Sequence, residues 1–177
     1  MRLSNELSFS KVNDIHGLTL PDAGQTLRLL NKVRGFENTT KPSNPHSDLR
    51  RFLDMASPAK PCELYILRSL GEVAAMVCTA NHNTLLEVHA LARNDKERFE
   101  GMGGVALSTV IRLAEESTGI QKVGLFCLPE LVPYYTGLGF GLDDEVNSDL
   151  PDDSRYLRMT REIPRATEYS NDERLAA

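Results

Sequence analysis

Three glycines stand close together in the middle of the chain, in the segment Gly101-Met102-Gly103-Gly104. A strand-like run, Thr84 to Ala92, and eight mostly charged residues precede them, and a helical run from about Val105 to Ser117 follows. The start of a helix carries backbone N–H groups that have no partner within the helix, and glycine lets a ligand approach them closely. The segment is therefore typical of a site for an anion such as a pyrophosphate.

The hydrophobic pattern around the glycines predicts one α/β domain over residues 1–163. Three strand-like runs joined by short turns are typical of an antiparallel meander. Turn-forming residues predict a loop over 37–45, and the polar segment 164–177 is expected to be a flexible tail. The predicted strands are Leu7–Val12, Glu63–Arg68, Glu72–Thr79, Thr84–Ala92, Lys122–Leu128 and Arg155–Arg161, and the predicted helices are Pro21–Val33, Ser47–Met55 with Ser47 as N-cap, Val105–Ser117 and Glu130–Thr136.

Composition excludes several classes of protein. The chain has 177 residues, 41% of them hydrophobic and 25% charged, which suits one globular domain that needs no metal or disulfide to fold. Its net charge of −5 gives no overall attraction for nucleic acid or an anionic membrane. No run is apolar enough for a membrane span or a signal peptide, and three cysteines without a CxxC pair indicate a reduced compartment. We therefore expect a cytoplasmic monomer or homodimer without nucleic-acid or membrane partners.

The glycine segment has two further readings. Residues 101–106 fit GxGxxA, a variant of the dinucleotide-binding fingerprint. In that fold the strand runs almost directly into the first glycine within a parallel array, whereas here residues 93–100 intervene and the preceding strands are predicted to be antiparallel. The second reading is a tight turn into a helix that binds nothing. A nucleotide-triphosphate loop is excluded, because the chain has no GxxxxGK[ST] segment.

Two segments resemble the GNAT superfamily of acyl-CoA-dependent N-acetyltransferases. Residues 98–103 (RFEGMG) fit its [Q/R]-x-x-G-x-[G/A] motif, and residues 134–140 (YYTGLGF) are similar to its aromatic-Tyr-x-x-x-Gly-Phe segment. The element order also agrees, including two helices between the first two strands, so the resemblance covers about residues 7–162. It implies an α/β (α+β) GNAT acyl-CoA N-acyltransferase fold, in which a mixed central sheet splays apart between its fourth and fifth strands and helices flank it.

The resemblance also implies how the chain would hold acetyl-CoA, its expected acyl donor. Backbone groups at the end of the fourth strand would pair with the pantetheine arm, and the loop and helix start would cradle the pyrophosphate. The implied cofactor-binding residues are Leu91, Ala92, Arg93, Arg98, Phe99, Glu100, Gly101, Met102, Gly103 and Gly104.

Three residues are candidates for the chemistry of acetyl transfer. Tyr135 matches the tyrosine that acts as general acid in many GNAT proteins, and a phenol keeps its proton at neutral pH; alternatively, Tyr134 and Tyr135 only pack. Glu87 stands fourteen residues before Gly101, the spacing of the catalytic glutamate in the histone-acetylating branch. Strand alternation puts His89 on the same face, so either residue, or both, is the candidate base for the amine. The alternative is a solvated Glu87 and a half-buried His89.

Two positions depart from the family pattern. Leu128 stands where many members carry an asparagine that contacts the cofactor, and Arg93 stands where valine is common. No metal is expected, because the imaginable set of Cys78, His82, His89 and Cys127 lacks the usual spacing of structural zinc ligands.

The predicted activity is direct transfer of an acetyl group from acetyl-CoA to a primary amine of a small molecule or a protein. The acidic balance of the chain fits a cationic acceptor. Two alternatives stay open: a catalytically degenerate GNAT-fold module that binds acyl-CoA for regulation or structure, and an NAD-type binding domain.

Overall fold

The computed structural model describes residues 7–34, 44–56 and 61–164. The predicted loop between residues 37 and 43 and the predicted tail after residue 164 lie outside the described residues. Within these ranges, no helix is both long enough and apolar enough to cross a membrane.

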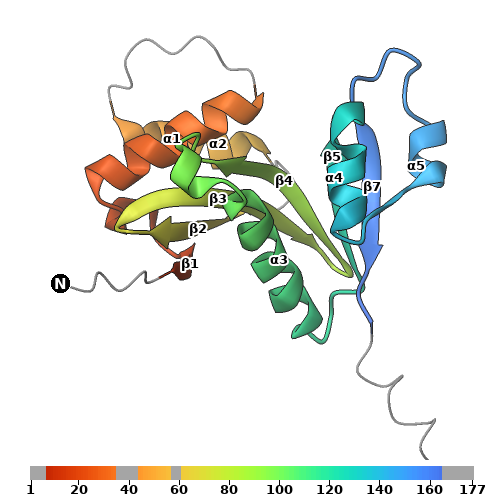
Figure 1. Cartoon of the computed structure of the whole chain (residues 1–177), viewed down its shortest axis with the longest axis horizontal. Helices are drawn as coiled ribbons and strands as arrows, with labels where there is room; N and C mark the ends of the chain where they lie inside the picture. Colours follow the sequence, from red (N-terminus) through yellow and green to blue (C-terminus); the bar gives the residue numbers. More distant parts are fainter. Residues whose placement is uncertain (1–6, 35–43, 57–60, 165–177) are drawn as a thin grey trace, which may run out of the picture.

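Seven strands of the described chain form one mixed sheet in the order β1-β2-β3-β4-β5-β7-β6 (Figure 1). Only β4 and β5 run parallel among the neighbouring pairs; all the others are antiparallel. The predicted meander is thus confirmed in the hairpins that join β2, β3 and β4. The strands are β1 Ser8–Val12, β2 Glu63–Ser69, β3 Glu72–His82, β4 Leu85–Arg93, β5 Lys122–Cys127, β6 Gly141–Leu142 and β7 Leu157–Glu162.

Helices cover both faces of the sheet. On one face, α1 and α2 bury Leu30 and Leu49 against β2, β3 and β4. On the other face, α3 buries Ala106 and Val110 in a second core that also contains Tyr135 from α4. The helices are α1 Leu20–Arg34, α2 Pro45–Ala56, α3 Met102–Glu115, α4 Val132–Gly137 and α5 Asp144–Ser148, and the short 3-10 turns are η1 Ile15–Gly17, η2 Glu97–Phe99 and η3 Pro129–Leu131.

The parallel pair β4–β5 separates part of the way along its length. Leu85 to Val88 pair with Lys122 to Leu125, but β4 continues to Arg93 and β5 to Cys127 without pairing. Figure 1 shows the two strands leaving a common end in a V. In the register with β3, Cys78 faces Ala90 and Thr79 faces Val88, so His89 is an extra residue in β4. Such a bulge bends and twists a strand, and this one lies where the separation begins.

Several predicted boundaries differ from those observed. The helix α2 begins at Pro45 instead of Ser47, because the Oδ1 atom of Asn44 accepts hydrogen bonds from the backbone N–H groups of His46 (3.1 Å) and Ser47 (3.3 Å) and so caps the helix. The strand β3 extends to His82, and the turn is at Asn83, which has a positive φ of 62°. The helix α3 begins at Met102, three residues earlier than predicted, and the short elements β6 and α5 were not predicted.

Candidate active site

The glycine-rich start of α3 lies next to the open part of the β4–β5 pair. Gly101 is the N-cap and has a φ of 78°, in the left-handed region that favours glycine. Its carbonyl accepts the backbone N–H of Val105 at 3.2 Å, so α3 is hydrogen-bonded from its first turn. Gly103 is buried, and a Cβ there would lie 3.9 Å from the Cβ of Arg93 at the end of β4. The predicted anion cradle and the predicted end of the fourth strand are therefore adjacent in space.

The loop before this helix is anchored by one buried side chain and one acidic residue. Phe99 is fully buried, while Arg98 is exposed and lies with its guanidinium carbon 4.9 Å from the Phe99 ring centroid. Arg98 and Lys96 both pair with the carboxylate of Glu72 on β3. These two cations, Lys96 first, lower the pKa of Glu72. The side chain of Arg98 is thus held by Glu72 at the edge of the loop, and Glu100 points to solvent.

The last residues of β4 keep one of their edges unpaired. Leu91, Ala92 and Arg93 pair with β3, but the edge that faces β5 has no strand partner beyond Val88 in the described sheet. The buried Asn94 fixes this end, because its backbone N–H donates to the carbonyl of Ala74 at 2.8 Å and its amide donates to that of Val73 at 3.1 Å. A fixed strand with a free edge can pair with an extended ligand.

The two adjacent tyrosines of α4 have different surroundings. Tyr135 is 9% exposed, and its ring makes edge contacts with Tyr134 (5.0 Å) and Phe140 (6.1 Å). Burial raises the pKa of Tyr135 to about 12, and Tyr134 and Cys127 act in the same direction. Tyr134 is 45% exposed, and its hydroxyl lies 3.2 Å from the position that a Cβ at Gly104 would take. Tyr134 therefore reaches across the open gap to the start of α3, a contact that the sequence did not predict.

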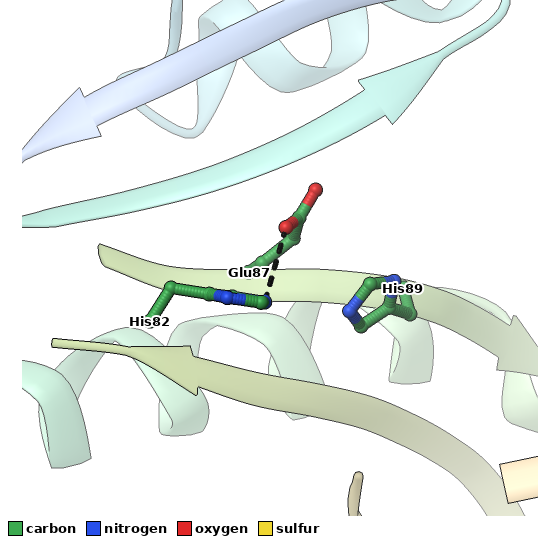
Figure 2. A group of neighbouring side chains, drawn as sticks. All are labelled: His82, Glu87 and His89. Carbon is green, nitrogen blue, oxygen red and sulfur yellow. Dashed lines mark ion pairs between the residues drawn. The ribbon is translucent and has the colours of Figure 1, made fainter. Parts of the chain in front are cut away.

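The predicted bases Glu87 and His89 lie together with His82 (Figure 2). One possible ligand atom from each of the three residues lies within 4.8 Å of the others. The Nε2 atom of His82 is 3.5 Å from Oε2 of Glu87, and the two imidazole rings make an edge contact at 6.3 Å. The proximity of Glu87 and His89 was predicted, but its cause is not simple alternation, because His89 is the bulge residue. Consistent with this, Val88 belongs to the α3 core and Ala90 to the α1–α2 core.

Arg158 of β7 completes this cluster from the far side of β5, whose Gly124 pairs with Glu87. Its Nη1 atom donates a hydrogen bond to Oε1 of Glu87 at 2.7 Å, and the arginine is only 5% exposed. The guanidinium crosses β5 over Gly124, where a Cβ would lie 2.4 Å from Nη2, and it stacks 4.9 Å from the ring centroid of Phe126. Gly124 is therefore required for close approach: any larger residue would displace the arginine from Glu87.

Sequence reasoning considered His82 only as part of a rejected zinc set and did not consider Arg158, for different reasons. A hairpin turn at Asn83 and Thr84 puts His82 opposite Leu85, diagonally next to Glu87, and this register was readable from the turn residues. Arg158 is separated from Glu87 by 71 residues, and no motif connects them. Only the strand order β4-β5-β7 brings the two side chains together.

Comparison with solved structures identifies the fold. No family model matches the chain. The ribosomal-protein-S18-alanine N-acetyltransferase from Escherichia coli is 17% identical, with a TM-score of 0.62 over 93% of this chain and 98% of that protein. An acyl-CoA N-acyltransferase from Pseudomonas aeruginosa is 20% identical (TM-score 0.59, 88% and 99% covered). A GNAT family acetyltransferase from Elizabethkingia anophelis with acetyl-CoA bound is 17% identical (TM-score 0.59, 90% and 99% covered).

The chain has the GNAT fold, a mixed α/β sheet with flanking helices that opens between β4 and β5. The predicted fold class is thereby confirmed over nearly the whole length of these proteins. At identities of 11–20%, the likeness concerns the fold, and the activity has to be argued from the residues of this chain.

Proposed function

We propose that the protein is an N-acetyltransferase that transfers the acetyl group of acetyl-CoA directly to a primary amine. One observation carries this proposal: the parallel strands β4 and β5 separate after Val88 and Leu125, beside the glycine-rich start of α3. A free strand edge for an extended amide-containing arm and a helix start for a pyrophosphate are thus adjacent.

The donor half of the site uses mainly backbone groups. The N–H groups of Met102, Gly103 and Gly104 lie in the first turn of α3, where N–H groups have no partner within the helix and the dipole favours an anion. Arg98 would add a cation at the edge of the loop. Along β4, the unpaired edge of Leu91 to Arg93 would bind the pantetheine arm. This backbone chemistry does not need the asparagine that Leu128 replaces.

The acceptor half would prepare the amine for attack on the thioester. An aliphatic ammonium has a pKa near 10.4, like lysine, so it must lose a proton at neutral pH. Glu87 and His89 are the proposed bases, acting directly or through water. The Oε1 atom of Glu87 already accepts a hydrogen bond from Arg158, so its Oε2 atom is the one available to the amine. The negative charge of Glu87 suits a cationic acceptor on a small molecule or a protein.

Tyr135 would stabilise the departing thiolate. Its pKa of about 12 keeps the phenol protonated at neutral pH. An ordinary thiol has a pKa of about 8.5, so complete proton transfer from this phenol to the thiolate would be uphill. We therefore propose that Tyr135 donates a strong hydrogen bond to the thiolate as it forms. As CoA leaves, the sulfur takes up the proton of Tyr135 while water returns one to the phenol, so that the net proton comes from solvent.

The decisive experiment measures CoA-thiol release from acetyl-CoA with a panel of primary amines, alongside calorimetric titration with CoA. Turnover that depends on both acetyl-CoA and an amine, and that falls in Tyr135→Phe, is expected. CoA binding without turnover on any amine would favour the alternative, a regulatory acyl-CoA-binding module. Binding of NAD instead of CoA would overturn the proposal.

A further inference from the structure

We propose that His82, Glu87 and His89 form a binding site for a divalent transition-metal ion, with Zn²⁺ as the preferred ion. We also propose that the bound ion inhibits acetyl transfer. Binding of the ion does not depend on the proposed function, whereas inhibition by the ion rests on the proposed function. The set of ligands contains two imidazoles and one carboxylate, which suits Zn²⁺, Co²⁺ or Ni²⁺ better than Ca²⁺ or Mg²⁺.

The geometry is close to what such an ion needs. The three ligand atoms lie within 4.8 Å of one another, and bonds of about 2.0–2.2 Å in tetrahedral geometry place ligand atoms about 3.4 Å apart. Side-chain rotations alone cover this difference, because all three residues stand on the paired strands β3 and β4. The hairpin turn at Asn83 and the bulge at His89 fix the backbone from which they extend.

The Nε2 atom of His82 supplies an independent reason. It is shielded from solvent and has no hydrogen-bond partner among the described residues, and the nearest acceptor, Oε2 of Glu87, is 3.5 Å away. A buried polar atom without a partner is costly, so such atoms in native proteins generally mark a ligand, a water or an ion. A metal ion between His82 and Glu87 would satisfy this nitrogen.

Arg158 fits the role of an outer partner that orients the ligating carboxylate. It holds Oε1 of Glu87 at 2.7 Å and leaves Oε2 directed toward His82, so the carboxylate would bind the ion through one oxygen. The positive charge of the guanidinium opposes a cation nearby, and this limits the affinity. A site that binds zinc reversibly is therefore expected, in contrast to a permanent structural zinc.

The consequence for catalysis follows from the residues involved. Glu87 and His89 are the proposed bases for the amine, and a metal ion would bind the lone pairs with which they would accept its proton. Inhibition by Zn²⁺ should therefore be relieved by raising the amine concentration and hardly affected by raising the acetyl-CoA concentration.

The chain offers a matched control. Its other two histidines, His16 and His46, also form a ring pair, here stacked, with ring centroids 5.8 Å apart. The Nε2 atom of His46 already hydrogen-bonds the carbonyl of Leu18 at 2.9 Å, and no carboxylate completes a metal-binding group there among the described residues. His46→Ala thus removes a histidine of a pair without touching the proposed metal site.

The test titrates the metal-free protein with Zn²⁺ by calorimetry and with Co²⁺ by visible absorption. We expect one ion per chain, an affinity at least about tenfold weaker in His82→Ala, and no change in His46→Ala. Circular dichroism of each variant reports whether it has folded, and Glu87→Gln serves if His82→Ala does not fold. No binding would overturn the proposal, and so would binding that survives loss of His82 and Glu87 but not loss of Cys62, the half-buried cysteine before β2.

The turnover assay separates the two proposals. Stoichiometric metal binding in a protein that acetylates no amine would retain the site and reject the proposed function. Turnover that Zn²⁺ leaves unchanged at concentrations saturating the site would retain the function and reject the inhibition.

Discussion

The two halves of the candidate site are constructed in different ways. The donor half consists of residues close together in the chain, Leu91 to Arg93 and Arg98 to Gly104, and uses mainly backbone groups at the end of β4 and the start of α3. The acceptor half consists of side chains from three strands, with Glu87 and Arg158 separated by 71 residues. We therefore expect the donor half to be sensitive to added bulk or charge, and the acceptor half to be sensitive to the loss of one functional group.

The largest effect is expected at Tyr135, on the β5 side of the gap. Tyr135→Phe keeps the ring that packs against Phe140 and removes only the hydroxyl. Turnover should fall about 10²- to 10⁴-fold, the usual contribution of acid–base catalysis, with CoA affinity little changed. Steady-state kinetics and CoA calorimetry on the same sample measure both quantities. Full turnover in this variant would mean that water or another residue serves the thiolate.

The raised pKa of Tyr135 predicts how far kcat holds constant toward alkaline pH. Because this pKa is about 12, ionisation of Tyr135 should not lower kcat up to about pH 10. The same raised pKa affects stability, because the folded state favours the neutral phenol more than the unfolded state does. The contribution of Tyr135 to the unfolding free energy is therefore complete below about pH 10 and is lost between about pH 10 and 12. Tyr135→Phe should remove this alkaline loss from the unfolding free energy measured by denaturant titration.

The second effect tests the donor half alone. Gly103→Asp puts a carboxylate in the first turn of α3, where the pyrophosphate is proposed to bind. Like charges about 4 Å apart repel by about 4 kcal/mol near a protein surface, so CoA affinity should fall on the order of 10²- to 10³-fold. Gly119→Asp, beyond the other end of α3 and with open space for a side chain, is the control. Equal CoA affinity in the two folded variants would remove α3 from the donor site.

The contrast between the donor half and the acceptor half explains which features the sequence could predict. Local patterns predicted the meander, the glycine-rich helix start and the aromatic segment of α4, because each depends on residues close together in the chain. The sequence could not show that Tyr134, and not its neighbour, reaches Gly104, since this depends on how α4 lies across the gap. It could not show the pair of Arg158 with Glu87 either, because that contact requires the order of three strands and a glycine at position 124.

The predicted boundaries failed where a single local interaction decides between neighbouring positions. Asn44 and Ser47 are both good N-caps, and the proline at position 45, pre-organised for the first turn of a helix, favours Asn44. The bulge at His89 had no signal, because a bulge follows from pairing with β3 and has no fixed residue type.

The third effect tests the acceptor half. Glu87→Gln keeps the size of the side chain but removes the negative charge, so kcat/KM should fall about 10- to 100-fold at neutral pH. The loss should shrink at high pH, where solution deprotonates the amine. His89→Ala makes the competing assignment testable, since a histidine base would place the acidic limb of the profile near pH 6.5. Wild-type pH profiles in both variants would show that neither residue is the base.

Glu87→Gln should also destabilise the fold, because Arg158 is only 5% exposed and would lose its counter-charge. We expect a loss of up to about 3 kcal/mol, the lower limit for breaking a buried pair, since Glu87 is itself partly exposed. Glu115→Gln is the matched control: its carboxylate pairs with Arg161 at the surface, 3.1 Å away, where a pair contributes about 0–1 kcal/mol. Equal denaturation midpoints in the two variants would contradict the role of Arg158 as an anchor.

The smallest effect concerns Tyr134, which connects the β5 side of the gap to the donor half. Its hydroxyl stands at the start of α3, so it should donate one hydrogen bond to a bound phosphate group. One such bond contributes about 0.5–1.5 kcal/mol, so Tyr134→Phe should weaken CoA binding about 2- to 13-fold and leave kcat nearly unchanged. Tyr156→Phe, which changes an exposed tyrosine in the segment before β7, is the control.

A Cβ at Gly104 would displace the hydroxyl of Tyr134, so Gly104→Ala and Tyr134→Phe should be non-additive in a double-mutant cycle on CoA affinity. Strict additivity would mean that Tyr134 and Gly104 do not act on the same part of the ligand.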